Sequence, residues 1–350
     1  MRSDLMLALI DELREKKTLS DESFQRLFFE RNTNITSYLY QQADEVRHQF
    51  YGNKVYLRGL IEISNICKND CLYCGIRRSN EKAVRYRLTL NDLQLCCQHG
   101  YELGFRTFVL QGGEDAFFSD DVLVEWVKTI HHDFPDCAIT LSLGERSRSS
   151  YQKLYDAGCS RYLLRHETAN PRHYNQLHPN NMQLETRLHC LEVLREIGFQ
   201  TGCGFMVGSP FQSFEDTLQD LRYMATFQPH MVGLGPFIPH KDTPFAHQSA
   251  GTLEDTLWYL AVVRLMLPKV LLPATTALAT IDAKGREAGL KAGANVLMPN
   301  LSPLSVRKKY MLYNDKASLD GEAAENVAAL SKWLNTIGYQ AVVDRGDALI

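Results

Sequence analysis

The chain has 350 residues, of which 45% are apolar and 23% are charged, as in an ordinary globular protein with a sizeable core. Its 38 basic and 41 acidic residues give a net charge of −3, which does not suggest binding to nucleic acid or to an anionic membrane. A mean hydropathy of −0.26 argues against a membrane protein. The first residues, MRSDLMLALIDEL, contain acidic side chains and no signal-peptide cleavage site, so we expect a cytoplasmic location.

The first fifty residues have the spacing typical of helices. Leu5, Leu9 and Ile10 recur at helical intervals, and Asp21 and Glu22 precede a second apolar run. We therefore expect a helical N-terminal extension over residues 1–50.

From Val55 onward, short apolar strands alternate with amphipathic helices. Helices are expected over Asp121–His132, Leu184–Glu196, Ser213–Phe227 and Leu253–Leu267. Eight strands are expected over Tyr56–Ser64, Thr107–Gln111, Ala138–Leu143, Tyr162–His166, Thr201–Val207, Met231–Gly235, Val270–Thr275 and Asn295–Met298. Near-continuous apolar strands that alternate with helices are typical of a parallel sheet. The closed form of such a sheet is the (β/α)₈ barrel, and an open doubly wound sheet is the alternative.

The predicted fold class is therefore α/β, a TIM-type (β/α)₈ barrel with a helical N-terminal extension. The barrel is expected to occupy residues 51–315. Residues 316–350 are expected to form a C-terminal tail that packs on the barrel and includes a helix near Asn326–Ile337.

Three of the nine cysteines lie close together, in the segment Cys67-Lys-Asn-Asp-Cys71-Leu-Tyr-Cys74. Thiolates are soft ligands suited to iron–sulfur clusters or zinc, but a structural zinc site needs four protein ligands. Three thiolates on a [4Fe–4S] cluster leave one iron open to a cofactor or substrate. The alternatives are a zinc site with a remote fourth ligand and chance clustering. The other six cysteines are expected to be small buried side chains: Cys96, Cys97, Cys137, Cys159, Cys190 and Cys203.

Polar and glycine residues follow several of the predicted strands. The segment Gln111-Gly112-Gly113-Glu114-Asp115 closes the second strand, and glycines there would let the backbone approach a ligand closely. Further polar residues are Thr140, Ser142 and Glu145 after the third strand, Arg165 to Thr168 after the fourth, and Arg187 on the next helix. Barrel enzymes build their sites at this end of the strands. A carboxylate and a guanidinium could bind the hydroxyls and the carboxylate of a ligand, or they could form a structural ion pair.

The cysteine loop and its place after the first barrel strand resemble those of the radical S-adenosylmethionine (SAM) superfamily. The resemblance implies a single [4Fe–4S] cluster on Cys67, Cys71 and Cys74, with SAM on the open iron. It implies reductive cleavage of SAM to a 5′-deoxyadenosyl radical. It does not identify a catalytic side chain. The SAM contacts that it implies are Tyr73, Gln111, Gly112, Gly113, Glu114, Ser142, Arg165, Glu167, Arg187 and Tyr310.

Five segments resemble the [FeFe]-hydrogenase maturases of the HydE type: TLSLGE (140–145), RYLLRHETANP (161–171), MVGLGPFIPH (231–240), LPATTALAT (272–280) and GANVLMPN (293–300). The resemblance implies a role in assembling the di-iron subcluster of the hydrogenase active site, the H-cluster. It implies an organometallic substrate, an iron–carbonyl–cyanide–cysteine complex, bound by Thr275, Thr276, Met298 and Tyr313. The implied partners are the maturases HydG and HydF and an external electron donor. Residues 311–350 contain no cysteine, which agrees with one cluster.

Other readings remain open at this point. A methylornithine synthase or a biotin synthase would share the cysteine loop and the barrel. An iron–sulfur carrier or scaffold would use the same thiolates without a SAM pocket. The basic segment with Arg77, Arg78, Lys82, Arg85 and Arg87 is either a solvated face or a binding surface for an anion or a partner.

Overall fold

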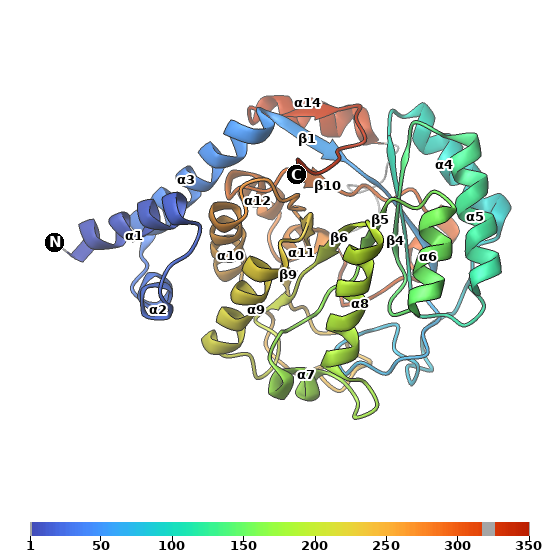
Figure 1. Ribbon diagram of the computed structural model, residues 1–350, viewed down its shortest axis with the longest axis horizontal. Helices are drawn as coiled ribbons and strands as arrows, with labels where there is room; N and C mark the ends of the chain where they lie inside the picture. The colour runs from blue at the N-terminus through green and yellow to red at the C-terminus, as the bar shows by residue number, and fades with distance from the viewer. Residues whose placement is uncertain (1, 317–325, 350) are drawn as a thin grey trace.

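The computed structural model describes residues 2–316 and 326–349, and its centre is a parallel sheet. Six strands follow one another in the order β2 (Gly59–Ser64), β3 (Thr107–Gly112), β4 (Ala138–Ser142), β5 (Arg161–Leu163), β6 (Gln200–Cys203) and β8 (Met231–Val232). Helices surround these strands in Figure 1: α4 (Leu90–Glu102), α5 (Asp120–Asp133), α6 (Arg148–Asp156), α8 (Leu184–Ile197), α9 (Phe214–Phe227) and α10 (Leu253–Met266). The four helices expected from the sequence are confirmed.

Isolated bridges close this sheet into a barrel. Met231 pairs with Leu271, Pro273 pairs with Val296, and Asn300 returns to Leu60 on the first strand. The (β/α)₈ prediction is therefore confirmed, and the doubly wound alternative is wrong. The expected seventh strand, Val270–Thr275, is present only as two bridges, because a proline within it has no N–H to donate.

Several other expected strands are divided or shortened. Tyr56–Ser64 is two strands, and the first of these, β1 (Lys54–Leu57), pairs with β10 (Val296–Leu297) and β11 (Gln340–Val342). Thr201–Val207 is divided into β6 and β7 (Met206–Val207), and β7 pairs with β9 (Gly235–Pro236). Four further helices, all within residues 171–307, are short: α7 (Pro171–Leu177), α11 (Thr276–Ile281), α12 (Gly285–Lys291) and α13 (Leu304–Arg307).

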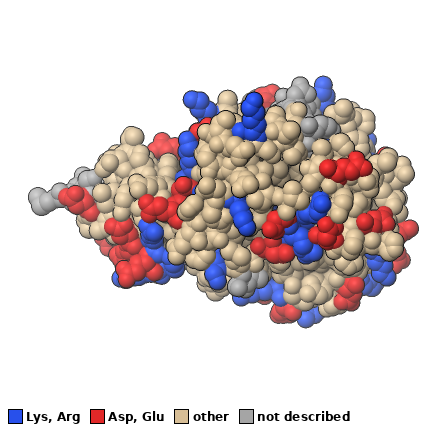
Figure 2. Space-filling model, turned by 90° about the horizontal axis from the view of Figure 1, so that it is seen from above, with Lys and Arg blue, Asp and Glu red and all other residues tan. Residues whose placement is uncertain are grey.

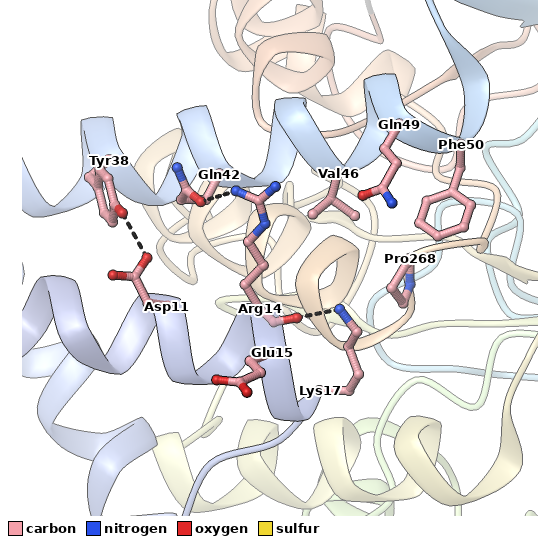
Figure 3. Close-up of a pocket in the computed structure, with 10 residues that line it drawn as sticks. All are labelled: Asp11, Arg14, Glu15, Lys17, Tyr38, Gln42, Val46, Gln49, Phe50 and Pro268. Atoms are coloured by element: carbon pink, nitrogen blue, oxygen red, sulfur yellow. Dashed lines mark hydrogen bonds between the residues drawn. The ribbon is translucent and has the colours of Figure 1, made fainter.

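The N-terminal segment is helical, as expected. It consists of α1 (Arg2–Lys16), α2 (Asp21–Phe29) and α3 (Thr33–Tyr51), which project from one side of the barrel in Figure 1. Ser20 and Asn32 cap α2 and α3 with their side chains. Between α1 and α3 lies a hollow of about 560 Å³ that is lined mostly by polar side chains, Arg14 and Gln42 among them (Figure 3). Pro268, after α10, also lines the hollow, and no cysteine does.

The C-terminal residues cover the end of the barrel at which the strands begin. After α14 (Val327–Thr336), which matches the expected helix, the chain forms β11 and crosses beneath the barrel. Arg161 on β5 donates to Asp347 (2.6 Å), Thr107 on β3 donates to the Arg345 carbonyl (2.7 Å), and the Ala348 N–H donates to Gln200 on β6 (3.1 Å). The other end, where the strands stop, is therefore the end that faces the cysteine loop. No helix in the described ranges has the length and apolar composition needed to cross a membrane.

Candidate active site

The cysteine loop follows β2 and is fixed by backbone and arginine contacts. Cys67, Cys71 and Cys74 are half-buried and unpaired. The Glu114 N–H donates to the Cys67 sulfur (3.4 Å), and the Lys68 N–H donates to the Glu114 carbonyl (2.9 Å). The Arg85 guanidinium donates to four backbone carbonyls of residues 65, 76, 77 and 80, at 2.6 to 3.0 Å. Arg85 therefore stabilises the loop from within the chain.

The backbone N–H donors beside the thiols fit an iron–sulfur cluster that is held by thiolates. Burial raises the pKa of all three thiols, and that of Cys74 rises to about 12. Backbone N–H groups donate to Cys67 and Cys74, which partly opposes this rise. Bound iron deprotonates such thiols outright. Within the described ranges, no three His, Cys, Asp or Glu side chains surround a single metal ion. This does not count against a cluster, in which each thiolate binds its own iron.

The glycine segment after β3 lies directly against the cysteine loop. An added Cβ on Gly113 would stand 2.2 Å from the Ile66 carbonyl oxygen and 2.7 Å from the Cβ of Cys67. The sequence suggested that these glycines admit a ligand. At Gly113, however, the space is filled by the chain itself, and the residue is needed so that the two loops can touch.

Buried charges gather beside this contact. Glu114 lies 3.0 Å from the Lys68 amine and 4.0 Å from the Arg187 guanidinium, and Arg187 lies 2.8 Å from Glu145. Burial alone would lower the pKa of Arg187, but the carboxylates of Glu145 and Glu114 help to raise it. Gly144, at φ +76°, makes room for Glu114, because a Cβ there would be 2.1 Å from the Glu114 Cγ. The structure thus brings the expected Glu114 and Arg187 together.

A strained turn follows β5. Glu167 has φ +67°, a conformation that costs a residue other than glycine about 1–3 kcal/mol. Its carboxylate lies 3.0 Å from the Arg165 guanidinium. Between them, the fully buried His166 accepts a hydrogen bond from the Gly204 N–H at Nδ1, so its Nε2 donates to Asp220 (3.1 Å). The His166–Asp220 pair stabilises the strained turn and keeps Glu167 next to Arg165.

Tyr73 packs beneath the cysteine loop. His178 donates from Nδ1 to the Tyr174 carbonyl (3.0 Å), so its Nε2 accepts a hydrogen bond from the Tyr73 hydroxyl (3.2 Å). Burial lowers the pKa of His178 to about 3, so this histidine is neutral. The packing role of Tyr73 is therefore present in the structure, and its contact with adenine stays a prediction.

A segment from Tyr310 to Lys316 crosses the end of the barrel next to the cysteine loop. The Gly75 N–H donates to the Leu312 carbonyl (2.9 Å), and the Asn314 N–H donates to the Pro239 carbonyl (3.1 Å). On the barrel side, Gln111 donates to the Tyr310 hydroxyl (3.3 Å). We call residues 310–316 the strap. Tyr313 is part of it, and burial raises the pKa of this tyrosine.

The strap is also bound to a buried carboxylate on β2. Lys316 donates to Glu62, which is fully buried and also accepts from Asn300 (3.0 Å). Sequence reasoning missed this pair. The available signal was a single carboxylate within the apolar strand GLIEIS.

Three buried polar groups without a hydrogen-bond partner face the barrel interior. They are Thr140 Oγ1, Arg165 Nε and Thr275 Oγ1. The residue before each of them, Ile139, Leu164 or Ala274, packs in the hydrophobic core, so alternation along the extended chain turns these three toward the barrel interior. Such groups suit a polar or anionic ligand, because an unmet buried donor is costly. Thr140 was noticed at a strand end but not chosen as a site residue.

The other expected site residues lie in two different parts of the barrel. Thr276 begins α11 beside Thr275. Ser142 ends β4 in register with Gln111 on β3. Met298 lies elsewhere, in an apolar cluster with Tyr56, Met231, Leu271 and Val296 near β1. The structure therefore does not bring Met298 into the same group as the two threonines.

Comparisons with known proteins point to the same kind of enzyme as the cysteine loop and its surroundings. The sequence model of the radical SAM superfamily matches residues 61–224. The [FeFe] hydrogenase maturase subunit HydE of Thermotoga maritima is 40% identical over 332 residues, which cover 95% of this chain and 94% of that protein.

Two further relatives are more distant. The 3-methylornithine synthase of Methanosarcina barkeri is 30% identical over 305 residues, 87% of this chain and 85% of that protein. A crystal structure of methylornithine synthase aligns with a TM-score of 0.84 at 26% identity, over 95% of this chain and 97% of the other. The chain belongs to the radical SAM superfamily and, within it, to the family of the [FeFe]-hydrogenase maturase HydE.

Proposed function

We propose that this radical SAM enzyme acts in assembly of the di-iron subcluster of the [FeFe]-hydrogenase active site, the H-cluster. The observation that carries the proposal is 40% identity to a HydE maturase over 95% of the chain. The family uses a [4Fe–4S] cluster and SAM. When bound, these cofactors supply a 5′-deoxyadenosyl radical through reductive cleavage of SAM.

The residues of this chain position and shield that chemistry. Cys67, Cys71 and Cys74 would hold one cluster, and the absence of cysteine from residues 311–350 supports a single cluster. The SAM contacts proposed from the cysteine-loop side are Tyr73, Gly112, Gly113, Glu114 and Arg187, and those around the barrel mouth are Gln111, Ser142, Arg165, Glu167 and Tyr310. A strap bound to Glu62 at one point and to Gly75 at another excludes water from the barrel mouth.

A small organometallic substrate, the iron–carbonyl–cyanide–cysteine complex, is the proposed ligand of the barrel interior. The inward hydroxyl groups of Thr140 and Thr275 and the Arg165 guanidinium can donate hydrogen bonds to its anionic ligands. Thr276 and Tyr313 are proposed to contact the substrate beside Thr275, and Met298 is proposed as an apolar contact deeper in the barrel.

The proposed partners are the maturases HydG and HydF and an external electron donor. We place the protein in the cytoplasm, because the cysteine loop carries the free thiols of Cys67, Cys71 and Cys74 and a reducing compartment preserves such thiols.

Two assays test the proposal. After anaerobic reconstitution and reduction, the protein with SAM should release 5′-deoxyadenosine, and an iron–sulfur carrier would not. With HydG, HydF and an apo-hydrogenase, it should then restore hydrogenase activity. Conversion of lysine to methylornithine without any hydrogenase activation would replace the proposal with a methylornithine synthase function.

A further inference from the structure

The basic segment near the cysteine loop is divided into two kinds of side chain. Residues 67–88 contain six basic and two acidic residues, a net charge of +4 in a chain whose total is −3. The Arg85 guanidinium donates hydrogen bonds to four backbone carbonyls, and Arg77 binds Asp70 (2.7 Å) within the loop. These two arginines shape the loop and are not available to a partner.

The remaining cations of the segment face solvent. Arg78 is exposed, and the side chains of Lys68, Lys82 and Arg87 are 62%, 79% and 41% exposed. Their carboxylate partners, Glu114, Asp242 and Asp115, are almost buried, so the positive charge is presented outward. Glu81 is the one acidic residue of the segment that the described structure leaves exposed.

Exposed apolar and basic side chains complete this surface. Phe117 and Val84 are more than half exposed, and the Arg87 guanidinium lies 5.0 Å from the centre of the Phe117 ring. Asn65 donates to the carbonyls of Val84 (2.9 Å) and Lys309 (2.7 Å), which brings the backbone next to the exposed Lys308 close to that of Val84. We call Lys68, Arg78, Lys82, Val84, Arg87, Phe117 and Lys308 the basic face. On the end of the molecule that bears α14, by contrast, acidic and basic side chains are mixed (Figure 2).

The basic face lies next to the cysteines. Lys68 follows Cys67 directly, and the Arg78 N–H donates to the Asn69 carbonyl (2.8 Å) inside the loop. Arg87 binds Asp115 (2.7 Å), the neighbour of the residue whose N–H donates to the Cys67 sulfur. The basic face is therefore separated from the thiols by only one or two contacts between residues. The strap crosses the mouth of the barrel, and the C-terminal residues lie at its opposite end.

We propose that the basic face docks an acidic one-electron carrier protein, which reduces a cluster held by Cys67, Cys71 and Cys74. This inference rests on the proposed function. In the step, one electron leaves the reduced carrier, which is oxidised by one electron, and enters the cluster, which is reduced by one electron. No bond or proton moves. A surface that combines exposed cations with two exposed apolar side chains suits a small, transient and electrostatically steered interface.

The test reverses charges that have no role in the site. The variant Arg78→Glu, Lys82→Glu, Lys308→Glu leaves Lys68 and Arg87 intact, because both pair with carboxylates beside the cysteine loop. The matched control, Lys128→Glu, Lys269→Glu, Lys332→Glu, changes three exposed lysines on α5, after α10 and on α14. Each protein receives electrons from a reduced acidic flavodoxin or ferredoxin, or from a photoreduced deazaflavin as a small reductant.

We expect the charge-reversed variant to form 5′-deoxyadenosine at least tenfold more slowly than wild type with either carrier at low salt. With deazaflavin, it should match wild type, and the control variant should match wild type throughout. Calorimetry on the cluster-free proteins gives a second readout: the carrier should bind wild type more weakly as salt increases and should not bind the variant measurably.

Two results would overturn the inference while leaving the proposed function intact. One is equal carrier-driven rates and affinities in wild type and the charge-reversed variant. The other is failure of both carriers to reduce a wild-type protein that deazaflavin activates. Absence of 5′-deoxyadenosine with every reductant would instead contradict the proposed function itself, and the inference with it.

Discussion

Gly113 and Cys67 are in such close contact that the Cβ Gly113 lacks would stand 2.7 Å from the Cβ of Cys67. The same Cβ would stand 2.2 Å from the Ile66 carbonyl oxygen, a backbone atom that cannot turn aside as a flexible side chain can. The glycine segment after β3 and the cysteine loop after β2 therefore form one unit. The position of the first thiol depends on a residue 46 positions later in the chain.

The first prediction concerns this contact. Gly113→Ala should displace the cysteine loop at a cost of about 1–3 kcal/mol and reduce iron incorporation. Iron per chain and visible absorbance after anaerobic reconstitution measure the effect. Gly112→Ala is the matched control, because its added Cβ would meet its nearest neighbours at 3.2 Å. Equal iron content in both variants would show that the loop tolerates the added methyl group.

The second prediction concerns the cluster ligands. Cys67→Ser, Cys71→Ser and Cys74→Ser should each abolish the cluster and SAM cleavage, because each removes one of three protein ligands. The six remaining cysteines are buried and serve as controls that should keep the cluster when changed to alanine one at a time. Wild type should contain about four irons per chain, and about eight would refute a single cluster.

Sequence patterns sufficed for the barrel because hydrophobic periodicity and chain order are local signals. They also sufficed for the cysteine loop, whose spacing is its signature. They failed where a side chain meets a distant segment. Glu62 and Lys316 are 254 positions apart, and nothing in either neighbourhood indicates the other. The requirement for glycine at position 144 could not be predicted either, because it depends on the Glu114 side chain, with which a Cβ on residue 144 would clash. The division into residues 1–50, 51–315 and 316–350 stays a prediction.

The third prediction concerns SAM binding. Glu167→Ala and Arg187→Ala should each weaken SAM affinity about ten- to hundredfold, since hydrogen bonds to charged groups contribute about 1.5–3 kcal/mol. Calorimetry on the cluster-loaded protein measures the change, and iron content should stay at the wild-type level. Arg172→Ala is the control: this arginine also forms an ion pair, with Asp216 on α9, but it is not among the proposed SAM contacts.

Arg187→Ala also leaves the half-buried Glu145 without its partner, so thermal unfolding should be measured alongside affinity. Wild-type SAM affinity in both the Glu167 and the Arg187 variants would make these residues members of structural ion pairs only.

The fourth prediction is a pH dependence at the covered end of the barrel. Burial alone would raise the pKa of Asp347, but hydrogen bonding and charge from Arg161 outweigh burial and lower the pKa to about 2. The folded state therefore binds fewer protons than the unfolded state between about pH 4 and pH 2. The stability from this pair is fully present above about pH 4 and is lost as the pH falls through about 2.

Asp347→Asn should remove this acid sensitivity. The difference in unfolding free energy between variant and wild type should shrink as the pH falls, by less than about 2 kcal/mol because solvent screens a half-exposed carboxylate. Urea unfolding across this pH range measures it. A difference that does not change with pH would show that Asp347 contributes through its hydrogen bonds and not through its charge.

The last prediction separates SAM cleavage from maturation. Thr275→Val keeps the shape and β-branching of Thr275 but removes a buried hydroxyl for which the described structure shows no hydrogen-bond partner. Folding should therefore change little, whereas an anionic substrate in the barrel would lose a donor. Thr140→Val, across the barrel interior, should act in the same way.

Both single variants and the double variant Thr275→Val, Thr276→Val should release 5′-deoxyadenosine from SAM at rates near wild type. Each should fall well below wild type in a reconstituted hydrogenase maturation assay with HydG and HydF. The lost donor is expected to weaken substrate binding by about 1–3 kcal/mol, so raising the substrate concentration should partly restore maturation. Full maturation at limiting substrate would remove these threonines from the site, because a hydroxyl that bound the substrate could not be deleted without an effect on its affinity.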